Sequence, residues 1–176
     1  LVLGIGMTVS ACYIFLAIVL APAIIEGGIS PLAAHLYVLY WGVLSFITPP
    51  VAIAAITASS IANTSALKTG FLSMRLGSIL FFLPVLFVFD PAMLMQGQIS
   101  DVILSFTMAI FAIIIISSAF EGYIYFFGKI NYLFRILYFL AGIFILIPHL
   151  ISKYIGFSIL IIMLLLLLFT RVYNKE

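Results

Sequence analysis

Charged side chains are scarce in this 176-residue chain, at 7% of its residues, and cysteine occurs only once. A soluble domain carries about 25% charged residues, whereas this chain is 66% hydrophobic with a mean hydropathy of +1.43. The composition therefore predicts an integral membrane protein of the all-α class, embedded in a lipid bilayer. The single cysteine, Cys12, excludes an intramolecular disulfide and a cysteine-rich metal site. No basic run and no nucleic-acid motif is present, so no nucleic-acid partner is expected.

The residue patterns of enzymes and of ATP-driven machines are also missing. The chain has no Ser/His/Asp arrangement, no metal-ligand spacing and no glycine–lysine loop for ATP phosphates. We therefore expect no catalytic residue and no organic cofactor. No acidic residue lies inside an apolar segment, which argues against a voltage sensor and a carboxylate-centred proton relay. Four acidic residues lie at the expected ends of apolar segments: Glu26, Asp90, Asp101 and Glu121.

The most informative stretch is an apolar run, roughly residues 36–61, with Pro49 and Pro50 near its centre. The run is long enough to cross a bilayer, for which about 20 apolar residues suffice. Each proline lacks an N–H and clashes with the carbonyl four residues before it, so a continuous helix cannot pass through. Carbonyls freed inside hydrocarbon must find partners in the protein, in water or on an ion. The break, with Ser45 and Thr48 beside it, is therefore a candidate binding site.

The other apolar segments complete a set of about five to six membrane segments. The segment at residues 69–89 contains Pro84, so a kink is expected there. Residue 1 lies inside an apolar segment with no initiator Met, which favours a C-terminal fragment of a longer protein. Apolar segments are expected at residues 1–25, 69–89, 99–120, 132–147 and 154–170, besides the broken one.

Basic residues are distributed unequally between the two sides of the predicted segments. One side receives only Lys153, together with Glu26, Asp90 and Asp101. By the positive-inside rule, the side with more basic residues is cytoplasmic, which places the C-terminus and the loops at 62–70 and 121–135 in the cytoplasm. The basic residues of that side are Lys68, Arg75, Lys129, Arg135, Arg171 and Lys175.

Several motifs resemble one family, the large permease subunit of tripartite ATP-independent periplasmic (TRAP) transporters. Motifs within residues 68–92, Pro84 among them, and Glu121-Gly122-Tyr123 resemble its fused small-plus-large permease branch, which works with the TAXI type of binding protein. The resemblance covers essentially the whole chain. The motifs that carry it are Leu3-Gly4-Ile5-Gly6-Met7, Ala33-Ala34-His35-Leu36, Ile47-Thr48-Pro49-Pro50-Val51-Ala52, Lys68-Thr69-Gly70-Phe71, Arg75-Leu76-Gly77 and Phe89-Asp90-Pro91-Ala92.

The resemblance implies an elevator-type secondary transporter, in which a hairpin tip and a broken helix form a sodium site next to the substrate. Residues 4–11 would be the hairpin tip and residues 12–25 its returning arm. The implied sodium ligands, partly backbone, are Gly6, Thr8, Ser10, Ser45 and Thr48, with Pro49 and Pro50 as the helix break. The family commonly has a proline at the tip, where this chain reads Gly6-Met7-Thr8. From the residues alone, a helix–helix contact face is the other interpretation of the small residues near the start.

These expectations define a permease component that imports an organic anion, such as a dicarboxylate, across the cytoplasmic (inner) membrane of a bacterium or archaeon. Sodium, or a proton, would be the coupling ion, and an extracytoplasmic solute-binding protein would deliver the substrate. Residues 1–65 would form the second-repeat hairpin and broken helix, and residues 66–176 the C-terminal transmembrane helices. The missing N-terminal remainder would supply the matching repeat. The alternative is a structural or assembly membrane subunit without a substrate site of its own.

Overall fold

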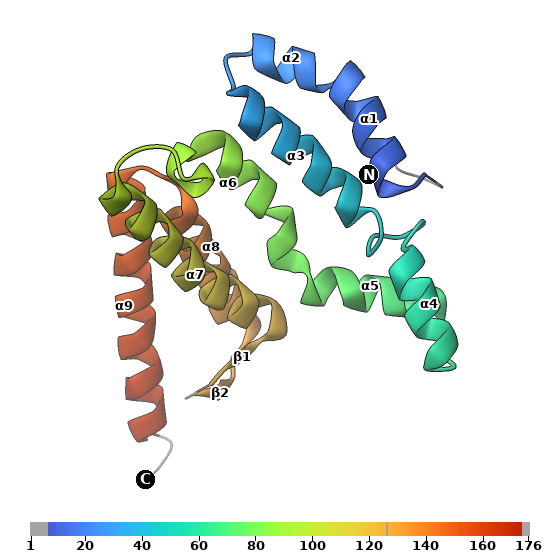
Figure 1. Cartoon of the computed structure of the whole chain (residues 1–176). Coiled ribbons are helices and arrows are strands. Elements are labelled where there is room, and N and C mark those ends of the chain that lie inside the picture. The colour runs from blue at the N-terminus through green and yellow to red at the C-terminus, as the bar shows by residue number, and fades with distance from the viewer. Residues whose placement is uncertain (1–6, 126, 174–176) are drawn as a thin grey trace. The chain divides into compact units, whose positions relative to one another are not determined.

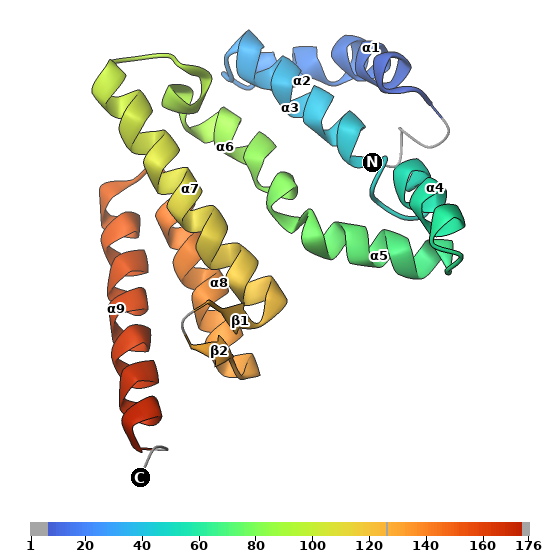
Figure 2. The ribbon, with the colours of Figure 1, turned by 60° about the horizontal axis from the view of Figure 1, so that its bottom comes forward.

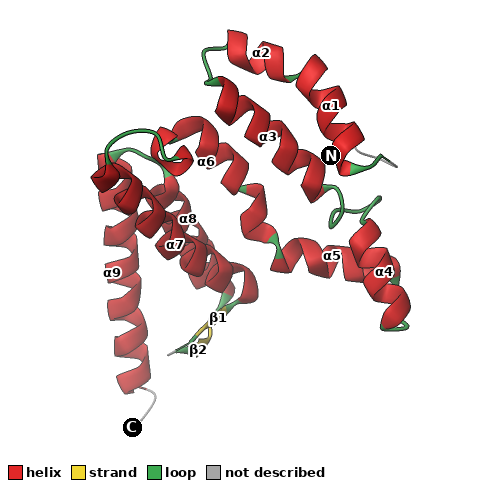
Figure 3. Ribbon diagram, viewed as in Figure 1, coloured by secondary structure: helices red, strands yellow, loops and turns green. Residues whose placement is uncertain are grey.

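The computed structural model describes residues 7–125 and 127–173, and side chains as far as Leu168 (Figure 1). Helices account for most of the described chain, as the composition predicted, and a pair of short strands accompanies them (Figure 3). The chain divides into two compact units, Leu1–Gln96 and Gly97–Glu176. The predicted division at residue 65 is a division by role in transport, and it stays a prediction.

The first unit begins with three helices, α1 (Val9–Val19), α2 (Ala21–Glu26) and α3 (Pro31–Leu44). Helix α3 starts where Ser30 accepts a hydrogen bond from the Ala33 N–H through its hydroxyl oxygen, with a proline in the next position. Helix α1 runs back along α3, so the start of α1 lies near the end of α3 (Figures 1 and 2). The two helices enclose a buried cluster of Cys12, Leu16 and Val38.

Beyond the break at the two prolines, the first unit continues with helices α4 (Ile53–Ile61) and α5 (Ala66–Leu76). Asn63, two residues past α4, has a positive φ of 51°, which asparagine tolerates better than most residues. The 3₁₀ turn η2 (Ser78–Phe81), helix α6 (Leu83–Phe89) and the 3₁₀ turn η3 (Pro91–Leu94) complete the unit.

The segment expected at residues 69–89 is bent by 71° between residues 66–76 and 78–89, with Gly77 at the break. Pro84 instead lies in the first turn of α6. The N–H groups of a first helical turn have no partner within the helix, so a proline is tolerated there without a kink. The expected kink is therefore replaced by a sharper bend seven residues earlier.

The second unit contains the helices α7 (Ile99–Glu121), α8 (Tyr132–Leu146) and α9 (Leu150–Tyr173). Helix α7 ends at Glu121, one residue past the segment predicted at 99–120, and Gly122 after it adopts a left-handed conformation. Between α7 and α8, strands β1 (Tyr123–Ile124) and β2 (Gly128–Lys129) form an antiparallel hairpin. The connection predicted as a loop at residues 121–135 therefore contains a short hairpin.

Two described helices are long and apolar enough to cross a membrane, Ile99–Glu121 and the Leu150–Leu168 part of α9. The bent pair of residues 66–76 and 78–89 is a third if it forms one span. Three shorter apolar helices are α1, α3 and α8. The predicted total of five to six membrane segments stays a prediction.

Glycines allow the helices of the second unit to pack closely. A Cβ atom at Gly142 would lie 2.5 Å from the Ile116 Cγ1, and one at Gly156 would lie 2.8 Å from the Ala141 carbonyl oxygen. A backbone atom cannot move aside as the end of a side chain can. Small residues at such crossings are typical of membrane helices, because close backbone approach increases van der Waals contact.

We expect Gly156→Ala to destabilise the second unit, because its added methyl group would overlap the α8 backbone. Overpacking of this kind costs about 1–3 kcal/mol in free energy of unfolding. Thermal unfolding of the purified protein in detergent measures the change. Ser158→Ala, at an exposed position of the same helix, is the matched control and should stay within about 0.5 kcal/mol. Equal stability of the two variants would contradict the close α8–α9 crossing.

Candidate functional site

The candidate site is the break between α3 and α4. After Leu44 the main chain tightens: the N–H groups of four successive residues, Ser45 to Thr48, donate to carbonyls three residues earlier, over 3.1–3.4 Å. Pro49 and Pro50 then contribute no N–H, and the peptide bond between them is cis. The α-helical pattern of hydrogen bonds therefore ends at Leu44, where the double proline predicted an interruption.

The chain returns to a helix through an unusual backbone conformation at Ala52. Its φ is +34° and its ψ is 45°, in the left-handed region, which costs a residue with a Cβ roughly 1–2 kcal/mol. Two hydrogen bonds hold this turn: the Ala52 N–H donates to the Thr48 carbonyl at 3.0 Å, and the Ala54 N–H donates to the Phe46 carbonyl at 3.1 Å. Helix α4 begins at the next residue, Ile53.

The break leaves main-chain oxygens available. Within the described residues, no hydrogen bond reaches the carbonyl oxygens of Ile47, Pro49, Pro50 or Val51. Main-chain carbonyls in proteins are nearly always paired, with protein, water or a ligand. Four such oxygens fall within five residues of the chain, and neutral acceptors of this kind can hold a small cation.

Two buried hydroxyls lie in the same turn. The Ser45 hydroxyl donates to the Gly42 carbonyl at 2.6 Å, and the Thr48 hydroxyl donates to the Leu44 carbonyl at 2.7 Å. Ser45 is only 3% exposed and Thr48 only 9%. Because each hydroxyl proton is already donated, the lone pairs of its oxygen remain for a proton donor or a cation. Among the residues the structure describes, no three His, Cys, Asp or Glu side chains gather as a metal site, so a cation here would meet neutral oxygens.

Helix α5 supports the break from one side, which the sequence analysis did not anticipate. A Cβ atom at Gly70 would lie 2.7 Å from the Pro49 Cγ, and one at Gly77 would lie 2.9 Å from the Ile47 Cδ1. The two glycines are seven residues apart, close to two helical turns, and so share one side of this segment. That spacing was readable in the sequence, but nothing there showed which segment it faces.

The predicted partners from the hairpin tip are only partly described. Gly6 lies outside the described residues. Thr8 caps α1 by accepting a hydrogen bond from the Ala11 N–H at 3.3 Å, and Ser10 is exposed within α1. In the described part of the chain, neither Thr8 nor Ser10 is hydrogen-bonded to the break. The structure thus brings together Ser45, Thr48 and the prolines, and the full five-residue ion site stays a prediction.

The start of α1 nevertheless lies near the break. One turn after Thr8, the Cys12 side chain contacts α3, with its Sγ 3.4 Å from a Cβ placed at Gly42. The Gly42 carbonyl accepts the Ser45 hydroxyl, so these helices meet one turn before the break. Farther along the pair, the Tyr13 hydroxyl and the His35 Nδ1 are hydrogen-bonded at 3.1 Å. His35 therefore takes part in the packing of α3 against α1.

A comparison with known families gives one match. The family model described as the DctM component of the tripartite ATP-independent periplasmic transporter matches residues 1–100, more than half of the chain. The matched region contains helices α1 to α3, the break between α3 and α4, and helix α5, which packs against the break. No curated protein and no solved structure matches the chain.

We expect Gly70→Ala to lower the free energy of unfolding by about 1–2 kcal/mol, because the added methyl group would overlap the Pro49 ring. Helix propensity acts in the opposite direction, since alanine favours a helix over glycine by about 1 kcal/mol. A double-mutant cycle with Pro49→Ala separates the two effects, with stability measured by thermal unfolding. In the Pro49→Ala background the same change should be neutral or stabilising. An identical effect in both backgrounds would show that α5 does not press on the ring.

Proposed function

The chain belongs to the family of DctM components of TRAP transporters, and on this premise we propose that its α3–α4 break is a coupling-ion site. The family establishes a membrane permease component of a transporter. The proposed activity is uptake of an organic anion, such as a dicarboxylate, driven by a sodium gradient. An extracytoplasmic solute-binding protein delivers the substrate.

The observation that carries this proposal is the oxygen-rich break. Between Ser45 and Val51 lie two hydroxyl oxygens with free lone pairs and four carbonyls that accept no hydrogen bond from the described residues. Neutral oxygens at a helix break hold sodium in other secondary transporters. A proton as the coupling ion would call for a titratable side chain, and residues 45–52 contain none. This composition favours sodium over a proton.

The start of α4 supports an anionic substrate beside the cation. In the described part of the chain, the N–H groups of Ile53 and Ala55 have no hydrogen-bond acceptor. The first N–H groups of a helix carry partial positive charge and favour a carboxylate. A bound cation and this helix start would together attract the negative charge of an organic acid.

The remaining parts of the proposal follow from charge placement and family resemblance. The protein lies in the cytoplasmic (inner) membrane with its C-terminus in the cytoplasm, as the basic residues of the loops favour. An elevator movement would carry the site across the bilayer. The matching repeat would come from the N-terminal remainder, so residues 1–176 alone should not transport.

We expect Thr48→Val and Ser45→Ala in the full-length permease to raise the sodium concentration for half-maximal uptake by tenfold or more. Tenfold corresponds to about 1.4 kcal/mol of ion binding, comparable to one lost ligand. The assay follows radiolabelled succinate into proteoliposomes in the presence of the solute-binding protein and an imposed sodium gradient.

Thr57→Val and Ser60→Ala are matched controls for these variants. Their hydroxyls also donate to carbonyls of their own helix, at 3.0 and 3.1 Å, but both are exposed and lie beyond the break. Both controls should keep the wild-type sodium dependence. If the Ser45 and Thr48 variants do so too, while only their stability falls, the chain is better explained as a structural subunit with a packed kink.

Removal of sodium should lower the thermal stability of the purified full-length permease. A ligand present at 100 times its dissociation constant stabilises the folded state by about 2.7 kcal/mol. We expect a higher midpoint of thermal unfolding in sodium chloride than in choline chloride at equal ionic strength, and no such difference for Thr48→Val. A midpoint that depends on pH but not on sodium would indicate proton coupling instead.

A further inference from the structure

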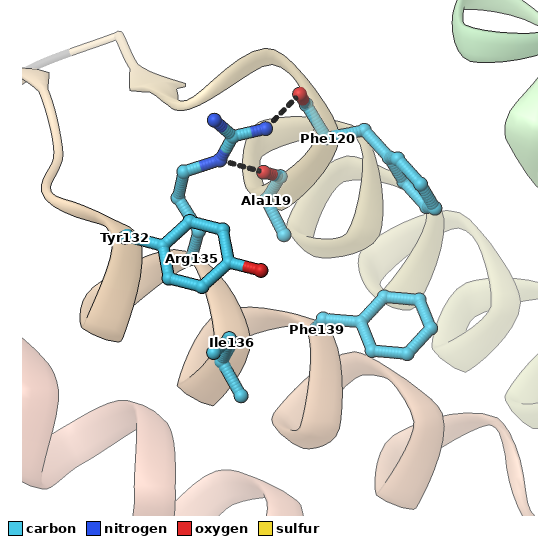
Figure 4. Close-up of a pocket in the computed structure, with 6 residues that line it drawn as sticks. All are labelled: Ala119, Phe120, Tyr132, Arg135, Ile136 and Phe139. Carbon is cyan, nitrogen blue, oxygen red and sulfur yellow. Dashed lines mark hydrogen bonds between the residues drawn. The ribbon is translucent and has the colours of Figure 1, made fainter.

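A cavity of about 230 Å³ lies where the end of α7 meets the start of α8 in the second unit (Figure 4). Ligand sites for drug-sized molecules range over about 300–1,000 Å³, so this cavity is small for a whole substrate. It suits a smaller group or part of a longer molecule. Its lining combines aromatic rings, aliphatic groups and one cation: Ala119, Phe120, Tyr132, Arg135, Ile136 and Phe139.

Arg135 binds the end of α7 with one edge of its guanidinium. Its Nε donates to the Ala119 carbonyl at 2.8 Å, and its Nη2 donates to the Phe120 carbonyl at 2.6 Å. A Cβ at Gly122 would lie 3.2 Å from the Arg135 Cδ and Nε, and the φ of Gly122 is +68°. The positive φ and the close approach of the arginine therefore both favour a glycine at this position.

The outer edge of the same guanidinium remains available. A guanidinium has five N–H donors, of which the two carbonyls use two. Within the described residues, no acceptor contacts the Arg135 Nη1. The Nη1 and Nη2 donors of this edge form the fork that binds phosphate or carboxylate oxygens in a bidentate manner.

The position of the cavity, at one end of a helix long and apolar enough to cross a membrane, is the position expected of a membrane–water interface. The cavity is formed by the last turn of the 23-residue apolar helix α7 and the first turns of α8. Tyr132 is 75% exposed there, and tyrosine is enriched at this level of the bilayer. Phe120 and Phe139 pack edge-to-face at 5.6 Å and provide an apolar wall (Figure 4). The Arg135 guanidinium beside these aromatic rings complements a molecule with an anionic head group and an apolar tail.

We propose that this cavity binds an anionic phospholipid. Its phosphate pairs with the outer edge of Arg135, and the start of an acyl chain lies against Ile136, Phe120 and Phe139. Residues 117–139 contain Lys129 and Arg135 but only one acid, Glu121, so the local charge favours an anion. Basic pockets between membrane helices bind anionic lipid head groups for this reason. This proposal rests on the membrane location that the family match implies. It does not depend on the proposed ion site at the break.

A free phosphate or a soluble anion shares the chemistry of the head group but not of the tail. The cavity is lined mostly by apolar side chains, which add nothing to the binding of inorganic phosphate. A lipid buries apolar surface there as well, and each buried CH₂ contributes about 0.8 kcal/mol. The lipid is therefore the favoured source of the phosphate.

The test titrates the full-length permease with phosphatidylglycerol or phosphatidylcholine of identical acyl chains and counts bound lipids by native mass spectrometry. We expect tighter binding of phosphatidylglycerol, by tenfold or more, at one saturable site. Ile136→Trp, which fills the cavity, and Arg135→Gln, which removes the cation, should each abolish this preference. Leu140→Trp is the matched control, since Leu140 and Ile136 are both 42% exposed on α8 and only Ile136 lines the cavity.

Ile136→Trp keeps the proposal testable if Arg135→Gln loses the cap of α7 and fails to fold. Equal preference in Ile136→Trp and Leu140→Trp would overturn the proposal. A second arm adds inorganic phosphate without lipid and follows thermal unfolding. Stabilisation of the wild type, but not of Arg135→Gln, at millimolar phosphate would indicate a free-anion site and also overturn it. No response to phosphate is the expected result.

Discussion

Every main-chain polar group in hydrocarbon needs a partner, and in the described structure the break between α3 and α4 leaves several such groups without one. Two successive prolines remove two N–H donors. In the turn before them, each N–H donates to the carbonyl three residues earlier instead of four. Four carbonyls are left unpaired in the described structure. An uncompensated group of this kind costs several kcal/mol in a bilayer. The proposed ion would supply the missing partner, and the buried hydroxyls of Ser45 and Thr48 would extend the same set of oxygens.

The break is supported by packing rather than by helix continuity. Glycines on the neighbouring segment let its backbone approach the Pro49 ring and the Ile47 side chain. Close helix approach recurs in the second unit, where Gly142 and Gly156 accept isoleucine side chains. Both units thus depend on small residues at helix crossings, which is how membrane helices gain contact without a hydrophobic force between them.

The sequence predicted the features that depend on local chemistry. The interruption at Pro49-Pro50, the end of α7 at Gly122 and the mostly helical content all follow from rules that act within a few residues. The left-handed Ala52 and the 71° bend at Gly77 were not predicted, because each depends on contacts with other segments. The hydrogen bonds from Arg135 to carbonyls 15 and 16 residues earlier belong to the same class. The relation of Thr8 and Ser10 to the break also depends on tertiary packing.

The contact between Gly70 and Pro49 has a consequence for how this family can diverge. A side chain at position 70 is compatible only with a smaller residue at position 49, because its Cβ would lie 2.7 Å from the Pro49 Cγ. Substitutions at these two positions should therefore occur as pairs, although 20 other residues separate them in the chain. Pro49, which shapes the main chain at the break, thereby also restricts which residue can occupy position 70 of helix α5.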